Sequence, residues 1–230
     1  MQKDIAGFKI EVTRKKMKNI RLSVHPGGII KISAPENVTY RIIEQFVLSH
    51  REWILHKQKE MEKIVPTENH EYKNGDSVYL FGRELVLKIS YGGKRSASCD
   101  GDTVNLIIKP DDDPNECLKL INGFYKMMLE KQIERCLPVY EEKTRLYSSS
   151  WHIRDMKTRW GSCNVVSRRI CINLQLAKFP IECLEYVLLH ELTHIAVSNH
   201  GSEFKALLDK YMPDWRDIKD RLNREYIHMQ

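Results

Sequence analysis

Apolar and polar residues alternate in short runs through the N-terminal half of the chain. Residues 8–12 and 20–24 alternate with a period of two, and residues 29–32 follow a Pro-Gly-Gly turn as a hairpin partner. Gly82 and Gly101 each separate two β-prone runs, which predicts two further hairpins. We therefore expect this half of the chain to be rich in strands.

One helix is expected among these strands. Between residues 40 and 64 apolar residues recur at helical spacing, with charged residues between them. Asn37 and Thr39 precede this segment, and both residue types are typical helix N-caps. The pattern predicts a single amphipathic helix over residues 40–64.

The sequence changes character at residues 109–114. Two prolines and a run of aspartates stand there, between a strand-like segment and a helical one. We place the domain boundary at this point. The prediction is an α+β protein, with a strand-rich N-terminal region over residues 1–110 that contains one helix. A mainly helical region with a small antiparallel sheet is expected over residues 111–230.

A long helix is predicted directly after this boundary. Asp113 and Glu116 form a capping box, and Pro114 suits the first helical position. The helix is expected to run toward Arg145 and to be bent or broken at Pro138, because proline lacks the N–H that the helix interior needs.

A pair of strands and a buried helix are expected next. The strands are predicted within residues 151–173, where alternation returns. Pro180 marks the start of the helix, which runs to about Val197. This segment is apolar over nearly its whole circumference, which indicates that the helix is buried.

The buried helix carries the motif H-E-x-x-H at residues 190–194. His190 and His194 stand four residues apart, so both imidazoles lie on one face and can reach one ion, while Glu191 can touch a metal-bound water. A divalent ion would also supply partners for three polar side chains that are costly to bury alone. The alternative is a pair of histidines that bond to backbone carbonyls and hold no metal.

A catalytic zinc has three protein ligands and one open position, which directs attention to His200. It follows the motif after Asn199, a residue type that tolerates the left-handed conformation needed to end the helix and turn the chain back. The histidine spacing equals that of the metzincin signature, although Val197 stands where that signature has glycine. The alternative third ligand is Glu203 or Asp209. One Zn²⁺ per chain is predicted.

The chain resembles the YgjP-like metal-dependent hydrolases, which are grouped with the SprT-like zincin metallopeptidases. The resemblance covers most of the chain and rests on Trp160-Gly161-Ser162-Cys163, residues 172–180, the H-E-x-x-H motif, Asn199-His200, Phe204 and Met212-Pro213-Asp214. It implies a zincin-like catalytic region in which His190, His194 and His200 bind zinc and Glu191 is the general base. Lys205 departs from the pattern, because the family often has tryptophan there, and this concerns the shape of the site wall.

Five residues are candidates for contact with the substrate, namely Arg159, Trp160, Ser162, Ile172 and Tyr211. For residues 160–162 the resemblance implies only proximity to the site. Zincins commonly place a strand beside the cleft as a pairing edge for an extended peptide, and residues 168–174 are the candidate strand. Alternatively, Trp160 and Ile172 are core residues, Arg159 is a solvated charge, and Tyr211 packs instead of donating to an oxyanion.

The charge of the chain adds a second hypothesis. The formal net charge is +6. Six basic residues and no acidic residue stand between Val12 and Pro35. We call this set the basic segment: Arg14, Lys15, Lys16, Lys18, Arg21 and Lys31. It is typical of an edge strand guarded against pairing, or of a surface that binds nucleic acid.

Cysteine usage and hydropathy bear on the compartment. The six cysteines form no C-x-x-C pair, so we expect reduced, buried, inert thiols. No segment approaches the roughly 20 apolar residues of a membrane span, and the N-terminus lacks an apolar signal stretch. A cytoplasmic protein without membrane attachment is expected, and its oligomeric state is open.

These patterns together predict a zinc-dependent hydrolase, with a metallopeptidase as the first choice. In this mechanism Glu191 activates a zinc-bound water that attacks a peptide bond. One alternative keeps the site but takes a nucleotide pyrophosphate, with Lys157, Arg159, Arg168 and Arg169 neutralising phosphate charge. Another, from a different class, is a nucleic-acid-associated module in which the zinc site is ancillary.

Overall fold

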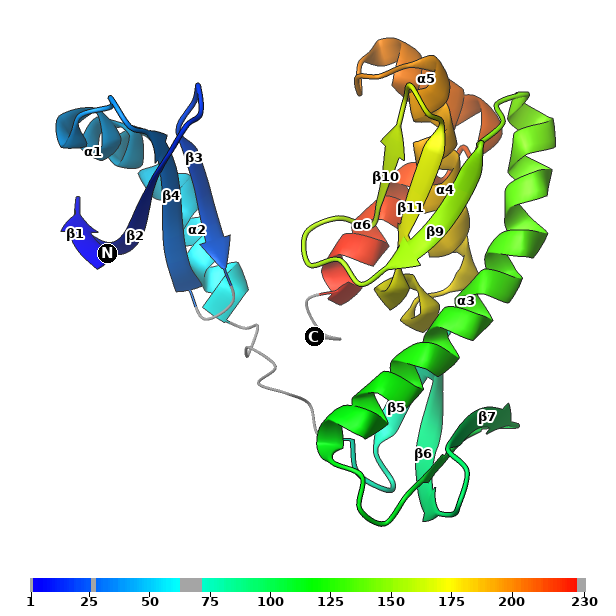
Figure 1. Cartoon of the computed structure of the whole chain (residues 1–230). Helices are drawn as coiled ribbons and strands as arrows, with labels where there is room; N and C mark the ends of the chain where they lie inside the picture. The colour runs from blue at the N-terminus through cyan, green and yellow to red at the C-terminus, as the bar shows by residue number, and fades with distance from the viewer. Residues whose placement is uncertain (1, 26–27, 63–71, 227–230) are drawn as a thin grey trace. The chain divides into compact units, whose positions relative to one another are not determined.

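The computed structural model of the chain describes residues 2–25, 28–62 and 72–226. The chain divides into two compact units: the first takes in Met1–Asn69 and also Arg224–Gln230, and the second spans His70–Asn223 (Figure 1). The sequence places the boundary at residue 110 instead. The difference arises because the strands before residue 110 pack against the helix that follows them, so they belong to the second unit.

A four-stranded sheet forms the first unit. It contains β1 (Gln2–Ile5), β2 (Phe8–Lys15), β3 (Arg21–His25) and β4 (Ile29–Pro35) in the order β1-β2-β4-β3, with β2 parallel to β4 and the other pairs antiparallel. The strands predicted from the alternation are confirmed, and β3 and β4 are hairpin partners as expected. Residues 26 and 27 of the predicted turn lie outside the described residues.

Two helices follow where one was predicted. α1 (Tyr40–Ser49) ends at His50, and α2 (Arg51–Glu62) begins at the next residue. The break is local, because the Ser49 hydroxyl donates to the Phe46 carbonyl at 2.9 Å and the His50 ring nitrogen Nδ1 lies 2.8 Å from the same oxygen. The Thr39 side chain makes no capping bond. The predicted helix end near Ile64 lies outside the described residues.

The core of the first unit lies between its sheet and its helices. The alternating residues of β2 and β4 supply one side, and α1 and α2 supply the other. The fully or almost fully buried members are Ile10, Ile30, Ile32, Ala34, Ile43, Val47 and Ile54.

A second four-stranded sheet opens the second unit. It contains β5 (Ser77–Leu80), β6 (Arg83–Tyr91), β7 (Ser96–Asp100) and β8 (Thr103–Ile108), in the order β5-β6-β8-β7. Both predicted hairpins are confirmed. Gly82 at the first hairpin tip has φ of +80°, and a Cβ there would lie 2.7 Å from the Pro180 side chain. Only glycine therefore allows this tip to dock on the segment that precedes the H-E-x-x-H helix.

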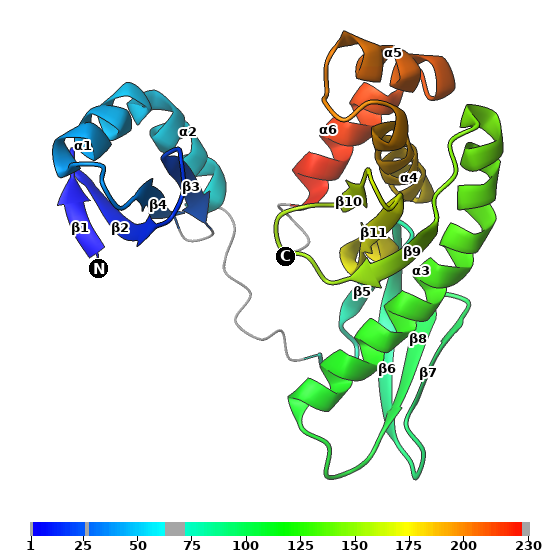
Figure 2. The same cartoon turned by 45° about the horizontal axis from the view of Figure 1, so that its top comes forward.

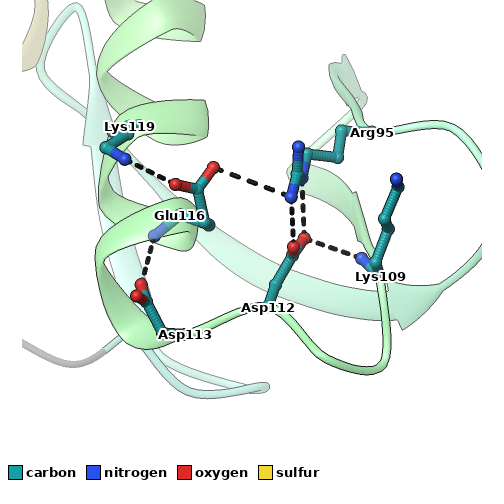
Figure 3. A network of polar contacts seen from close by, with 6 residues as sticks. All are labelled: Arg95, Lys109, Asp112, Asp113, Glu116 and Lys119. Atoms are coloured by element: carbon teal, nitrogen blue, oxygen red, sulfur yellow. Dashed lines mark hydrogen bonds and ion pairs between the residues drawn. The ribbon is translucent and has the colours of Figure 1, made fainter.

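The long helix α3 (Pro114–Thr144) starts at the predicted cap. The Asp113 side chain accepts a hydrogen bond from the Glu116 N–H at 3.1 Å. Before it, Asp112 accepts from the Lys109 N–H and from the Arg95 guanidinium, and Figure 3 shows these carboxylates and cations around the helix start. The network ties the end of the β5–β8 sheet to α3.

A bend or a break was predicted at Pro138, and α3 is not broken there. The helix is continuous across it and reaches from the β5–β8 sheet to the β9–β11 sheet (Figure 1). Pro138 cannot donate one backbone hydrogen bond of the helix. The burial of Ile133, Leu137 and Tyr140, on both sides of the proline, offsets this loss.

The predicted strand pair is a three-stranded sheet. β10 (Gly161–Asn164) runs antiparallel to β11 (Arg169–Asn173), as expected, and β9 (Ser150–Arg154) adds a parallel strand on the other side of β11. The order is β10-β11-β9, so the sheet is mixed and not antiparallel throughout. The short 3-10 helix η2 (Leu174–Lys178) leaves β11 and leads to Pro180.

Three helices complete the second unit. α4 (Ile181–Ala196) packs on β10 and β11, and α5 (Ser202–Tyr211) and α6 (Trp215–Tyr226) follow it, with α6 beside α4 (Figure 2). The buried character predicted for α4 is confirmed, because most of its residues have little or no exposed surface. Among the described helices, none is long and apolar enough to cross a membrane.

The cysteines are only partly as expected. All six are free thiols, and four of them are buried. Cys163 is half-buried and Cys99 is exposed, because the hairpin strand β7 that carries Cys99 leaves much of its surface open to solvent.

Candidate metal centre

Helix α4 brings His190 and His194 together one turn apart, and the loop after it returns His200 to the same place. The Nε2 atoms of His190 and His200 lie 3.0 Å apart. One ligand atom from each of the three histidines lies within 4.8 Å of the others. The structure thus gathers the three predicted ligands in one cluster.

The loop that returns His200 differs from the predicted left-handed turn. Helix α4 ends at Val197, whose backbone is extended at φ −132° and ψ 111°, and Asn199 does not adopt a positive φ. Asn199 instead acts through its side chain, which accepts a hydrogen bond from the Gly201 N–H at 3.1 Å. A polar side chain that bonds to the backbone turns the chain without a left-handed residue.

The same loop fixes the proton position on His194. Its Nδ1 lies 3.2 Å from the Val197 carbonyl oxygen. A carbonyl only accepts, so Nδ1 carries the hydrogen and Nε2 keeps its lone pair. This is one of the carbonyl bonds considered in the alternative without metal, yet it is also the contact that orients a metal-binding imidazole.

Aromatic side chains support the other histidines. The Tyr186 hydroxyl lies 3.5 Å from His190 Nδ1, on the far side of the ring from His200. The Phe204 ring centroid lies 4.9, 4.8 and 4.7 Å from those of His190, His194 and His200. The apolar Phe204 ring therefore contacts all three imidazole rings and limits their rotation.

The competing third ligands are not part of this cluster. Asp209 accepts hydrogen bonds from Trp215 Nε1 at 2.8 Å and from the Arg216 guanidinium. These bonds hold the pKa of the Asp209 carboxyl below its usual value. Glu203, the other alternative, lies in the first turn of α5 and is not among the clustered residues.

Burial favours the neutral form of His190 and His194. It lowers the pKa of His190 to about 3, with His194 and His200 adding to the effect, and it also lowers the pKa of His194. Neutral imidazole is the form that binds a metal. Ligands about 2.0–2.1 Å from a tetrahedral zinc are about 3.3 Å from one another, so three imidazoles in this arrangement fit zinc.

Glu191 is buried beside the histidines. Its exposed fraction is 5%, and burial raises its pKa to about 8, against the opposing charge of Arg159. Such a carboxyl holds its proton near neutral pH unless further positive charge is brought close. A buried carboxyl with a raised pKa next to three histidines is a strong candidate for acid-base chemistry.

Gly161 makes room for this carboxylate. A Cβ on Gly161 would lie 2.6 Å from Glu191 Oε1 and 2.8 Å from its Cγ, which is closer than side-chain atoms approach. The start of β10 thus packs directly against Glu191 and fixes where its side chain lies. The resemblance implies proximity of Gly161 to the site, and this contact confirms it.

The predicted pairing strand is not available to a peptide. Residues 169–173 form β11, which has β10 on one side and β9 on the other, so both of its edges are already paired. Alternating hydrophobicity identifies strands but not their order in a sheet, which is why the sequence pointed to β11. The strand at the edge of this sheet, next to Glu191, is β10.

The five candidate substrate residues lie in different surroundings. Trp160 lines the cavity beside the site and packs edge-on against Phe179, with ring centroids 5.0 Å apart. Ile172 is fully buried, so it is a core residue, as the alternative had it. Arg159 is exposed and acts on Glu191 through its charge, while Ser162 is half-buried in β10. Tyr211, at the end of α5, does not line the cavity.

A cavity of about 160 Å³ adjoins His190 and Glu191. Its walls come from the start of β10, from α4 and from α6. Lys219 and Asn223 of α6 line it, and no sequence pattern predicts either residue there, because α6 approaches the site only through the tertiary fold. Tyr186 was missed too, although it stands four residues before His190 on the same helix face.

The basic segment is partly structural. Arg14 donates to the Pro35 carbonyl at 2.9 Å and also to the Val38 carbonyl. Lys31 pairs with Glu11 at 2.9 Å. Among the described residues the pairing of β1 with β2 ends at Glu11, so at Arg14 and Lys15 only β4 pairs with β2. Arg21 lies in the edge strand β3, and the guarded-edge interpretation of the basic segment stays a prediction.

Comparisons with known proteins place the chain in a family. Residues 18–225 match the family model described as YgjP-like, metallopeptidase domain. No curated protein matches the chain. The metallopeptidase zymogen jannalysin of Methanocaldococcus jannaschii is 23% identical with a TM-score of 0.37, and the match covers 41% of this chain and 96% of that one. The metallopeptidase zymogen abylysin of Pyrococcus abyssi is 22% identical with a TM-score of 0.38, and the match covers 40% of this chain and 93% of that one. Because this family model matches most of the length of the chain, the chain belongs to the YgjP-like metallopeptidase family.

Proposed function

We propose that the protein is a zinc-dependent metallopeptidase in which His190, His194 and His200 hold one Zn²⁺ and Glu191 is the general base. The observation that carries the proposal is the convergence of three imidazoles beside a buried carboxyl group. Zinc in such a site supplies a Lewis acid that polarises a carbonyl and lowers the pKa of water toward about 7.

Glu191 moves the proton in this proposal. A divalent ion held by the three histidines would add positive charge beside the Glu191 carboxyl, which would offset the effect of burial on its pKa and favour the ionised form at neutral pH. The ionised carboxylate takes a proton from the attacking water and passes it to the leaving amine. The contact with Gly161 keeps the carboxylate in one position during both transfers.

An extended peptide suits the free strand edge beside the site. In an antiparallel pair alternate residues direct their backbone groups toward the partner, and the Asn173 N–H bonds to the Trp160 carbonyl at 2.9 Å. Gly161 and Cys163 therefore direct theirs away from β11. These groups can pair with an added strand, which would lie next to Glu191.

The nucleotide alternative has weaker support. Arg169 pairs with Asn164 at the far end of the β10–β11 hairpin, while Gly161 pairs with Ile172 at the end beside Glu191. Three residues of strand separate these positions, which amounts to about 10 Å. Arg168 and Arg169 thus project from the wrong end of the hairpin to neutralise a phosphate at Glu191.

A substrate screen on the zinc-loaded protein tests the proposal. Metal content is measured first, and the same preparation is then incubated with a peptide mixture and, separately, with nucleoside triphosphates. We expect about one zinc per chain and cleavage of peptides that chelation abolishes. Release of pyrophosphate or phosphate from the nucleotides, with every peptide left intact, would establish the alternative instead.

A further inference from the structure

The cavity beside His190 and Glu191 has walls of two kinds. Trp160, Tyr186, Val187 and Leu222 give it apolar surface. The remaining lining side chains on α6 are polar, and they are those of Lys219 and Asn223. Because the cavity shares His190 and Glu191 with the catalytic cluster, whatever fills it lies directly next to the reacting bond.

Lys219 and Asn223 form a matched pair on one helix face. They stand four residues apart on α6, so their side chains are neighbours, and Leu222 lies between them on the same wall. An ammonium and an amide N–H₂ side by side are donors for a carboxylate. Lys219 Nζ also lies over the Trp215 ring, 5.8 Å from its centroid, and both Lys219 and Asn223 are exposed to solvent.

We propose that this cavity is a subsite for a carboxylate on the residue next to the scissile bond, with Lys219 and Asn223 as its recognition residues. The proposal rests on the proposed peptidase function and adds the substrate class, an acidic peptide. The carboxylate comes either from an Asp or Glu side chain or from the peptide C-terminus. About 160 Å³ is the volume of about five water molecules, enough for a short acidic side chain with its methylenes against Leu222 and Val187.

The other charges around the cavity are compatible with an anion. Glu191 is the acidic residue that lines it, and it belongs to the α4 wall, whereas Lys219 belongs to the α6 wall. The charge of Arg159 opposes that of Glu191 from outside the cavity. Asp220 of α6 does not line the cavity but acts by its charge on Tyr186, which does. Glu191, the proposed base, is the acidic residue in the lining, and Lys219 and Arg159 supply positive charge near it.

Cleavage-site profiling tests the subsite. The zinc-loaded protein is incubated with a mixed peptide library, and the cut sites are identified by mass spectrometry. We expect Asp or Glu next to the cut bond about tenfold more often than their neutral amides, the ratio typical of one charge-assisted contact. Amidation of peptide C-termini separates the two sources, since it abolishes cleavage only if the terminal carboxylate is the group bound.

Charge reversal gives the second arm of the test. Lys219→Glu is expected to remove the acidic preference and to favour Lys or Arg at the same position, and Lys219→Gln to remove the preference alone. Lys131→Glu on α3 is the matched control, because it changes the net charge equally at an exposed position that does not line the cavity.

The outcomes separate the two proposals. Cleavage without acidic preference, or a preference that survives Lys219→Glu and Lys219→Gln, overturns the subsite and leaves the peptidase in place. A wild-type protein that binds zinc but cuts no peptide overturns the peptidase proposal, and the subsite with it.

Discussion

A methyl group at Gly161 is the sharpest structural perturbation of the site. In Gly161→Ala the new Cβ would lie 2.6 Å from Glu191 Oε1 and 2.8 Å from Glu191 Cγ, where ordinary contacts begin at 3.4 Å. The carboxylate would have to move by roughly 0.8 Å to restore contact distance. Rotation of the carboxyl group alone is insufficient, because Cγ is crowded too.

Two effects of known size follow. Forcing a methyl group into a packed interior costs about 1–3 kcal/mol of unfolding free energy. Displacing a catalytic group by about 1 Å costs on the order of 10²-fold in rate. We therefore expect Gly161→Ala to fold with reduced stability and to lose about two orders of magnitude in peptide cleavage.

Urea unfolding of a double-mutant cycle isolates the contact. Glu191→Ala removes the three atoms nearest to the new methyl, so Gly161→Ala should cost little in that background, with a coupling energy of about 1–3 kcal/mol. Gly123→Ala on α3 is the control: a Cβ there meets nothing within 4 Å, so alanine should stabilise the helix by up to about 1 kcal/mol. Additive effects of the substitutions at positions 161 and 191 would refute the proposed packing of Glu191 against β10.

Three further predictions concern other parts of the chain. His200→Ala should stay folded but hold zinc much more weakly, because the core does not include this exposed side chain; full zinc occupancy under mild chelation would exclude His200 as the third ligand. Asp112→Asn should remove a pH-dependent part of the stability, because the Arg95 guanidinium lowers the pKa of Asp112 to about 2 from the usual 3.8. In urea unfolding the wild-type protein should be more stable than the variant by the full amount above about pH 5, and the difference should shrink as the pH falls through 4 toward 2. A difference that stays constant with pH would count against this ion pair. Charge reversal of Lys15, Lys16 and Lys18 together should leave hydrolysis of a short peptide within about twofold, since these residues lie in the first unit; a tenfold loss with the fold intact would assign that surface to the substrate site.

The sequence predicts the cluster of three histidines because its geometry is local. Residues at positions 190 and 194 share a helix face in any α-helix, and a third histidine after a short loop can return to them. The manner of that return was not predictable, because Asn199 turns the chain through its side chain and not through a left-handed backbone. Local spacing therefore fixed which residues meet but not the conformation that joins them.

The predictions that the structure contradicts concern features that depend on tertiary packing. Strand order is not encoded in alternation, so the central β11 was taken for the edge that belongs to β10. Pro138 is tolerated because burial on both sides outweighs one missing bond. Lys219 reaches the cavity only because α6 folds back beside α4, and a helix pattern contains no information on that placement.

Glu191→Gln tests the central claim most directly. The substitution keeps the volume and a polar tip but removes the base, and Glu191 stands about 100° around the helix from His190, away from the direction of that ligand. Zinc content and peptide turnover are measured on the same purified preparation. The account predicts about one zinc per chain together with a loss of turnover on the order of 10²–10⁴-fold. Retained zinc with retained turnover would contradict it and leave the three histidines with a structural or storage role.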